Sequence, residues 1–360
     1  MTHLQIDIAT VHHKIGKLVD STMNLKATEG VRETGPIGIM DMNNWEWSQG
    51  VALFAVYLYY QETRDSSLLT QLQNWFDRHI ESGTIPDKNI NTMCPLLTLS
   101  YLYEETGNEI YLSICKEWAV YAMEELPRTG EGSMQHIVSG NPNEGEIWDD
   151  TLYMTVLFVA RMGALLKNDS YVQESIHQFL VHLKYLTDPK SGLFYHAWTF
   201  KENHHFAAAL WARGNAWYTA GLVDYMDMIT LPDGVRKFLL SSLERQVSKL
   251  SDVQSPSGMW HTLLLEPESY EETSATSAFA YGILKAVRLG YLPHSYQAVG
   301  MKAMGAVIKQ IDEDGIVHGV SYGTGKKWTL QEYRDIPICP MPYGQSMALL
   351  MLVEGLKHIE

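Results

Sequence analysis

Residues 213–229 read RGNAWYTAGLVDYMDMI, a stretch in which small and apolar residues cover almost the whole circumference of the predicted helix. A helix with so little polar surface must be buried on all sides in a folded protein. Five further segments have the same character, at 45–62, 91–106, 150–166, 273–289 and 343–359. The sequence therefore predicts six buried helices distributed along the chain.

More polar, amphipathic segments alternate with the buried ones, at 66–80, 108–126, 170–186, 233–250 and 294–311, with 6–24 before the series. Their single apolar stripe predicts helices with one face on the core and the other in water. An inner ring of helices covered by an outer ring requires this alternation, and an open superhelical array shows the same pairing. An open array usually ends in polar capping helices, whereas the last segment here is apolar. We therefore predict an all-α, closed (α/α)6 barrel that forms a single domain over residues 1–360.

Composition and charge exclude several classes of function. The 360 residues include 27 Lys and Arg against 42 Asp and Glu, and a net charge of −15 argues against nucleic-acid binding. The longest apolar runs, such as 153–159, are far shorter than the ~20 residues of a membrane span. Residues 1–7 lack the features of a signal peptide, and Cys94, Cys115 and Cys339 are an odd number without CxxC spacing. We expect a cytoplasmic protein with no membrane or nucleic-acid partner, and its oligomeric state, monomer or dimer, is left open.

Clusters of aromatic and polar residues stand directly before the predicted buried helices. They lie at 45–47, 89–92, 148–150, 211–215, 271–274 and 341–344. In a toroid all inner helices begin at the same end, so these clusters would ring one mouth of the barrel. Concave sites with aromatic walls and a few polar groups are the usual form of small-molecule sites. We predict that a ligand binds at this mouth.

The run Trp148-Asp149-Asp150 is the first candidate for catalysis. An Asp at a helix start commonly caps the helix by accepting hydrogen bonds from its first free N–H groups. A carboxyl group in apolar surroundings has a raised pKa, which suits general acid catalysis. The two roles are compatible, and the pattern supports both.

The run WARGNAW at 211–217 places two tryptophans around Arg213 and Gly214. A guanidinium matches a carboxylate through two parallel hydrogen bonds, so a sugar acid lying against aromatic faces is a fitting ligand. The alternative is an arginine that only joins helix ends among core tryptophans. The pattern leaves both interpretations open.

Histidines supply the remaining polar candidates, His136, His196, His204 and His205. The chain has 14 histidines but no HExxH or other regular ligand spacing, so we expect no metal site. A surface histidine is the simplest interpretation of His136 from the residues alone. No GxSxG elbow, P-loop or GxGxxG motif is present, so nothing indicates a serine nucleophile, a phosphate site or a dinucleotide cofactor.

Three motifs resemble those of one known family: IWDDTLYM at 147–154, WARGNAW at 211–217 and NTMCPLL at 91–97. They are similar to the unsaturated rhamnogalacturonyl hydrolases of glycoside hydrolase family 105 and, more distantly, to the unsaturated glucuronyl hydrolases of family 88. The resemblance extends from about Trp45 to the last predicted helix. It implies an (α/α)6 barrel that removes the 4,5-unsaturated uronic acid from the non-reducing end of lyase-generated oligosaccharides of the rhamnogalacturonan or pectin type. It also implies that no metal or organic cofactor takes part.

The resemblance assigns a mechanism and a set of site residues. An Asp, matched here by Asp150, protonates C4 of the vinyl ether, water adds at C5, and the resulting hemiketal opens and expels the remaining sugar. The tryptophans would wall the sugar, Arg213 would hold the uronate, and His196 would bond a hydroxyl or the water. The residues expected to contact the substrate are Trp47, Asn91, His136, Trp148, His196, His204, Trp211, Arg213 and Trp217.

The chain departs from the family pattern at two positions. Asn91 stands where some relatives carry an Asp, so either Asn91 supplies only hydrogen bonds or nearby Asp87 replaces that Asp. Asp149 stands where the family usually has an apolar residue, and it either raises the pKa of Asp150 or caps the helix.

Two other functions remain as alternatives. A sugar epimerase of the same fold would use a histidine pair to move protons, for which His196 and His204 are candidates. A non-catalytic helical-repeat protein would use the mouth only for binding. The leaving sugar, its linkage, and the preference for galacturonyl or glucuronyl groups are not determined by the residues.

Overall fold

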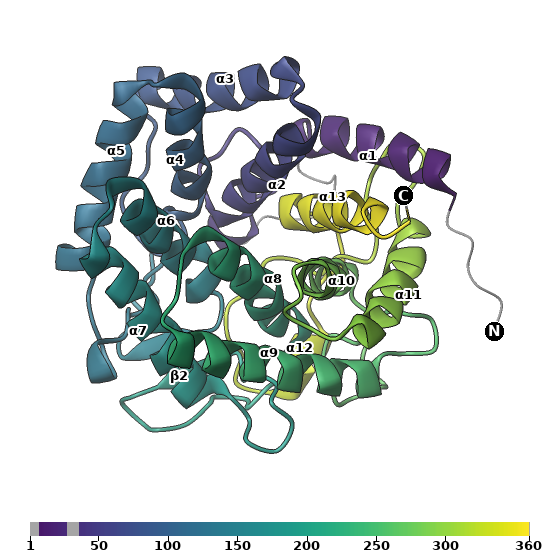
Figure 1. Cartoon of the computed structure of the whole chain (residues 1–360). Coiled ribbons are helices and arrows are strands. Elements are labelled where there is room, and N and C mark those ends of the chain that lie inside the picture. The colour runs from purple at the N-terminus through teal and green to yellow at the C-terminus, as the bar shows by residue number, and fades with distance from the viewer. Residues whose placement is uncertain (1–6, 27–35, 360) are drawn as a thin grey trace.

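The computed structural model describes residues 7–26 and 36–359, so residue 6 of the first expected helix and residues 1–6 of the N-terminal stretch lie outside it. The described helices form two concentric rings (Figure 1). The inner ring consists of α2 (Trp47–Thr63), α4 (Cys94–Thr106), α6 (Leu157–Leu166), α8 (Ala212–Met228), α10 (Thr273–Arg288) and α13 (Pro342–Leu356). The outer ring consists of α1 (Ile8–Met23), α3 (Ser66–Ser82), α5 (Glu109–Val120), α7 (Asp169–Leu186), α9 (Asp233–Val253) and α11 (Gln297–Ile308).

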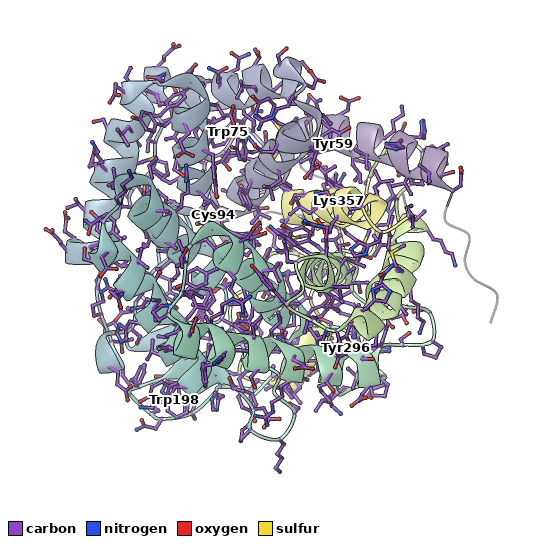
Figure 2. The ribbon with its side chains drawn as sticks, viewed as in Figure 1. Tyr59, Trp75, Cys94, Trp198, Tyr296 and Lys357 are labelled. Atoms are coloured by element: carbon purple, nitrogen blue, oxygen red, sulfur yellow. The ribbon has the colours of Figure 1, made fainter. Side chains whose placement is uncertain are left out.

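The inner ring is closed. Each inner helix packs against the next one along the chain, and α13 packs against α2. The open-array alternative is therefore wrong, and the (α/α)6 barrel is confirmed. Burial follows the predicted division: α8 is buried at every residue from Ala212 to Met226, whereas α3 buries a single stripe. Side chains fill the interior of the ring (Figure 2), and one hydrophobic core includes residues of both rings.

The connections at the two ends of the barrel differ in length. An inner helix passes to the following outer helix through a short turn, such as Arg64-Asp65 or Gly107-Asn108. Asp65 and Asn108 accept hydrogen bonds from first-turn N–H groups of the helices that they precede, which fixes where α3 and α5 begin. The connections from outer to inner helices are much longer, for example residues 187–211 between α7 and α8. The long segments therefore gather at the end where the inner helices begin.

Two local elements were not expected from the sequence. Strands β1 (Glu146–Trp148) and β2 (Ala197–Thr199) form an antiparallel pair within two of the long connections. The segment expected as one helix at 150–166 starts with a π-helical turn, Leu152–Val156, before α6 begins. Short π-helical turns are often found at functional sites. A further short helix, α12 (Leu330–Arg334), lies in the last long connection.

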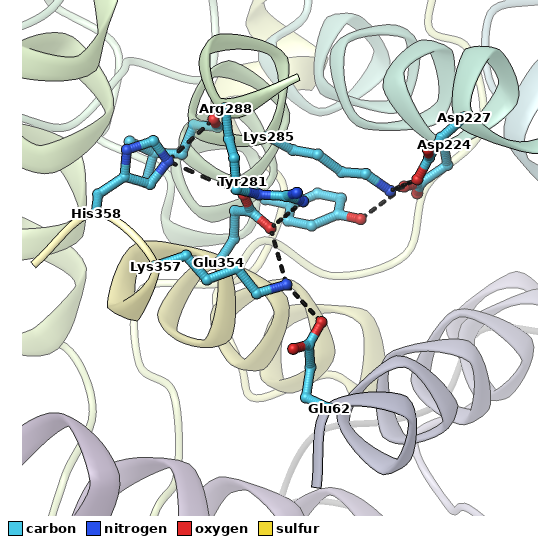
Figure 3. A network of polar contacts seen from close by, with 10 residues as sticks. Glu62, Asp224, Asp227, Tyr281, Lys285, Arg288, Glu354, Lys357 and His358 are labelled. Carbon is cyan, nitrogen blue, oxygen red and sulfur yellow. Dashed lines mark hydrogen bonds and ion pairs between the residues drawn. The ribbon is translucent and has the colours of Figure 1, made fainter. Parts of the chain in front are cut away.

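The opposite end of the barrel is joined by a polar network. Lys285 of α10 lies 2.7 Å from Asp224 of α8, and Arg288 of α10 lies 2.5 Å from Glu354 of α13. The residues of this network that are labelled in Figure 3 are Glu62, Asp224, Asp227, Tyr281, Lys285, Arg288, Glu354, Lys357 and His358. Burial alone would lower the pKa of Lys285, but its carboxylate partners raise it above the ordinary value. The network joins the ends of four inner helices, so we assign to this end of the barrel a role in stabilising the fold.

Two findings concern the expected location of the protein. Within residues 7–26 and 36–359, no helix combines the length and apolar character needed to cross a bilayer. All three cysteines are buried and free.

Candidate active site

Strand β1 brings the Trp148-Asp149-Asp150 run to the mouth of the barrel. Trp148 pairs with Ala197 of β2, and the Asp149 N–H donates to the His196 carbonyl at 3.0 Å. The strand ends at Trp148, and the carbonyl of Asp150 then accepts from Tyr153 and Met154 in the π-helical turn. Asp150 is therefore fixed at a junction between a paired strand and a buried helix.

The Asp150 carboxyl group is largely enclosed. Its side chain is 19% exposed, its Oδ1 atom is covered without a hydrogen-bond partner, and this atom lies 3.5 Å from Nδ1 of His136. Burial raises the pKa of Asp150 to about 7, and the positive charge of Arg213 opposes the rise. Near neutral pH the group is present both as acid and as carboxylate, which suits it to donate and accept a proton in one reaction.

His136 is buried beside Asp150, so its interpretation as a surface histidine is wrong. Its ring lies parallel to the Trp148 indole with 4.2 Å between centroids, and Nδ1 lies 2.8 Å from Oγ1 of Thr151. Burial lowers the pKa of His136 to about 3, so the ring is neutral at physiological pH. His136 therefore supports Trp148 and Asp150 as an uncharged polar group.

Asp149 points away from solvent and is fully buried, with neither side-chain oxygen hydrogen-bonded within the described residues. It packs on α8, where a Cβ added to Gly214 would lie 2.0 Å from Oδ2. Burial, followed by the charge of Asp150, raises the pKa of Asp149 well above its ordinary value. The expectation of a cap is wrong, because Thr151 precedes the π-helical turn and no side chain caps it. Asp149 is therefore a buried carboxyl group whose surroundings favour its acid form.

His196 forms the second polar wall of the site. Its ring lies 4.4 Å from Trp211 and 5.4 Å from Trp148 between centroids, and Nδ1 lies 2.7 Å from the Tyr333 hydroxyl. Its Nε2 atom is buried without a partner, and burial lowers the pKa of His196 well below the ordinary value. Tyr333 comes from α12, more than a hundred residues along the chain. No local pattern marks Tyr333, so sequence reasoning missed it.

Arg213 is buried in α8 and is held by the last long connection. Its Nη1 atom donates to the carbonyl of Ser321 at 2.8 Å and its Nη2 atom to that of Tyr322 at 3.0 Å. Its guanidinium carbon lies 4.4 Å from the Trp211 ring and 4.8 Å from the Tyr343 ring. Arg213 therefore joins α8 to this connection and does not join two helix ends. The positive charge also lowers the pKa values of both aspartates relative to burial alone.

Trp47 and Trp217 meet across the ring. Trp47 stacks on Tyr343 with 4.7 Å between centroids and meets the edge of Trp217 at 6.0 Å. Trp217 also lies 5.0 Å from Tyr153 of the π-helical turn. These contacts join the beginnings of α2, α8 and α13 in one aromatic cluster.

A further buried carboxyl group, Glu46, was not predicted as a site residue. It accepts from the Trp47 N–H at 3.0 Å and from the Ser139 hydroxyl at 3.3 Å, and burial raises its pKa to about 7. The charges of Glu46 and Asp150 both raise the pKa of buried Cys94 beyond the effect of burial. The signal in the sequence was a charged residue between two tryptophans in the first cluster of the mouth.

The two candidates for the family's second Asp differ in burial. Asn91 is 3% exposed, and its Oδ1 atom is covered without a partner. Asp87 is exposed, and its backbone carbonyl accepts from the Thr92 hydroxyl at 2.8 Å. Burial therefore favours Asn91 over Asp87 as the residue at the site.

His204 lies apart from this group. Its Nε2 atom is 2.6 Å from Glu202, and its ring is 5.9 Å from Trp328. His196 and His204 thus have separate partners, and no contact between them is found in the described part of the chain. Among the described residues, no group of three or more His, Cys, Asp or Glu side chains is arranged to hold a metal ion.

Comparisons with known proteins agree with this architecture. The family model of Glycosyl Hydrolase Family 88 matches residues 14–359. The chain is 32% identical over 316 residues to the unsaturated rhamnogalacturonyl hydrolase YesR of Bacillus subtilis (strain 168), covering 87% of this chain and 90% of YesR.

Solved structures of similar proteins overlay closely. Two of them, each described as a possible member of the GH105 family, come from Klebsiella pneumoniae subsp. pneumoniae MGH 78578 and Salmonella enterica subsp. enterica serovar Paratyphi A str. ATCC 9150. Both are 41% identical to this chain and cover 100% of it, with TM-scores of 0.93 and 0.95 over 96% and 97% of their own chains. The unsaturated glucuronyl hydrolase of Bacillus sp. GL1 shares the fold, with a TM-score of 0.71 at 16% identity over 96% of this chain and 95% of its own.

Proposed function

The chain belongs to glycosyl hydrolase family 88, and we propose that it removes the 4,5-unsaturated uronic acid from the non-reducing end of oligosaccharides of the rhamnogalacturonan type. The similarity to YesR, an unsaturated rhamnogalacturonyl hydrolase, supports this choice of reaction. The observation that carries the proposal is the enclosed Asp150 carboxyl group, whose pKa burial raises to about 7 beside the neutral ring of His136.

Asp150 acts first as an acid in the proposed mechanism. The protonated carboxyl group donates its proton to C4 of the C4=C5 vinyl ether, which leaves positive charge shared between C5 and the ring oxygen. Water then adds to C5, and the Asp150 carboxylate takes the proton that the water loses. The hemiketal opens by cleavage of the bond between C5 and the ring oxygen, which leaves a ketone at C5 and a hemiacetal at C1. The hemiacetal then collapses to an aldehyde, the bond from C1 to the remaining sugar breaks, and the sugar oxygen leaves with the proton of the C1 hydroxyl. One carboxyl group completes the cycle, without a second carboxylate opposite the glycosidic carbon.

The surrounding residues bind and orient the sugar. Trp47, Trp148, Trp211 and Trp217 supply apolar walls, and the other polar contacts are assigned to Asn91, His136, His196 and Arg213. The unpartnered Oδ1 atom of Asn91 and Nε2 atom of His196 are buried polar atoms, and a sugar hydroxyl would satisfy either of them. Arg213 contributes its positive charge to the uronate, while its contacts with Ser321 and Tyr322 fix its orientation.

The proposal also covers the cellular compartment and the polysaccharide that the enzyme helps to degrade. Buried free cysteines are typical of reducing compartments, so we place the enzyme in the cytoplasm, in pectin breakdown, as a single-domain protein. The epimerase alternative is not favoured, because His196 and His204 have separate partners.

Ultraviolet absorbance of the conjugated C=C–COO⁻ group tests the proposal directly. Purified protein is mixed, without added metal, with unsaturated disaccharides from rhamnogalacturonan, other pectins and glycosaminoglycans. We expect the absorbance to disappear with the rhamnogalacturonan disaccharide. If folded protein leaves every disaccharide unchanged, the proposed function is wrong, and saturated sugars become the next substrates to examine for epimerisation.

A further inference from the structure

A separate cavity of about 300 Å³ lies at the end of the β1–β2 pair where Glu146 faces Thr199. It is formed by three long connections that meet there, through the loop at 141–146, the loop at 199–206 and the segment at 326–328. None of the residues assigned to the active site lines it. The cavity therefore needs its own explanation.

One wall of the cavity is an exposed aromatic platform. Trp328 is 58% exposed, and its ring meets Phe206 edge to face with 5.0 Å between centroids. Lys326 holds its ammonium group 5.0 Å from the Trp328 ring and 4.3 Å from the Phe206 ring, which is close enough for cation–π attraction to both rings. An exposed indole offers a flat apolar surface that matches the C–H face of a pyranose ring.

The rim of the cavity is charged but internally paired. Lys201 lies 2.5 Å from Glu144, and Lys326 lies 3.3 Å from Glu146. Glu202, which His204 contacts at 2.6 Å, adds a further carboxylate to the lining. Carboxylates thus exceed ammonium groups on the rim, which disfavours an anionic ligand. Sugar hydroxyls, which both donate and accept hydrogen bonds, fit such a rim.

The cavity is connected to Asp150 through Trp148. The Trp148 indole N–H donates to Glu146 at 2.9 Å, and Glu146 lines the cavity two residues earlier on the same face of β1. Gly325 lies against the Trp148 ring, where an added Cβ would be 2.8 Å away, so the segment bearing Trp328 packs directly beside the active site.

We propose that this cavity is a second carbohydrate-binding subsite, in which Trp328 stacks on a neutral sugar ring of the leaving oligosaccharide. The inference rests on the proposed function, because the uronyl end of the same molecule must lie at Asp150. The enzyme would then bind longer oligosaccharides more tightly than disaccharides, and His204 would belong to the surroundings of this subsite.

Substrates of two lengths test the proposal. In the Trp328→Ala variant, we expect KM for an unsaturated rhamnogalacturonan tetrasaccharide to rise about five- to tenfold. The KM for the disaccharide should stay within twofold of the wild-type value, and Trp328→Phe should restore most of the loss. Phe238→Ala, which removes an exposed aromatic ring from α9, is the matched control and should change neither value. An equal change for both substrates, or no change for either, overturns the subsite.

Binding without turnover separates this proposal from the proposed function. The Asp150→Asn variant, with and without Trp328→Ala, is titrated calorimetrically with the tetrasaccharide and the disaccharide. The subsite is supported if adding Trp328→Ala raises Kd for the tetrasaccharide and leaves Kd for the disaccharide unchanged. This result would support it even if the wild-type protein hydrolyses neither sugar. A Kd that Trp328→Ala leaves unchanged overturns it. The Lys326→Met variant tests whether the bound sugar is neutral. A neutral ring predicts that Lys326→Met weakens tetrasaccharide binding less than Trp328→Ala does. A larger loss of affinity in Lys326→Met overturns the assignment of a neutral ring.

Discussion

Nδ1 of His136 lies 3.5 Å from Oδ1 of Asp150, but the two groups do not form an ion pair at neutral pH. Burial lowers the pKa of His136 to about 3 and raises that of Asp150 to about 7, so the histidine is uncharged whenever the aspartate titrates. The proton that titrates near pH 7 is therefore carried by Asp150 and not by His136. A charged histidine would instead have favoured the carboxylate and weakened the acid.

Asp150→Asn is expected to lower kcat by about 10²- to 10⁴-fold, because the amide cannot donate a proton to C4. The absorbance assay measures the loss. The melting temperature and the calorimetric affinity for the disaccharide should remain near the wild-type values, since the amide has nearly the same shape. Unchanged turnover in a folded variant would refute the role of Asp150.

The pH dependence of kcat follows from the raised pKa of Asp150. Protonation of C4 requires the acid form, so kcat should fall as the pH rises through about 7. Because the pKa of His136 is lowered to about 3, its titration does not contribute to the fall in kcat near pH 7. Measurement of kcat between pH 5 and 9 shows whether kcat falls or rises as the pH passes through 7. A rate that increases through pH 7 would mean that the carboxylate, rather than the acid, starts the reaction.

The fold was predictable because a closed double ring imposes a strong pattern on the chain. Inner helices such as α8 are apolar on all sides, outer helices such as α3 have one stripe, and both signals are local in sequence. The short β1–β2 pair was not predictable, since three residues per strand are too few to show alternation. The π-helical turn at Leu152–Val156 shares its composition with an ordinary buried helix.

The residues of the candidate site that lie in sequence motifs were predictable. Those that reach the site only through tertiary contacts were not. Trp148, Asp150 and Arg213 lie in short runs of aromatic and charged residues that can be recognised in the sequence. The Tyr333 contact with His196 and the burial of Glu46 depend on segments distant in sequence, which local patterns do not report. The pKa values depend on burial for the same reason.

Gly214→Ala should destabilise the protein by about 1–3 kcal/mol, because the new Cβ would lie 2.0 Å from Oδ2 of buried Asp149. Gly16→Ala is the matched control, since nothing lies within 4 Å of its added Cβ in the exposed part of α1. That change should stabilise the helix by about 0.5–1 kcal/mol. Urea unfolding measures both variants. A neutral Gly214→Ala would show that Asp149 moves freely, contrary to its tight packing.

Lys285→Met should reduce the free energy of unfolding by about 3–5 kcal/mol, because Asp224 is left buried without its cationic partner. Adding Asp224→Asn should recover part of the loss by removing the unpaired charge. Lys237→Met, on the exposed face of α9, is the control and should change stability by less than about 0.5 kcal/mol. Hydrolysis of the disaccharide should persist in all three proteins at 25 °C. An inactive but folded Lys285→Met would contradict the assignment of this end to stability.

Arg213 contacts both the protein and, in the proposed function, the uronate, and two variants separate these roles. Arg213→Ala should raise KM by about 10- to 100-fold, the effect of losing a charge-assisted hydrogen bond to a carboxylate. Ser321→Ala removes the Ser321 hydroxyl, which also accepts from Nη1, and leaves the Ser321 carbonyl and the guanidinium charge in place, so KM should change less than threefold. Melting temperatures show how much each change loosens the connection at 321–322. If Ser321→Ala raises KM as much as Arg213→Ala does, Arg213 acts by anchoring this segment and not by binding the uronate.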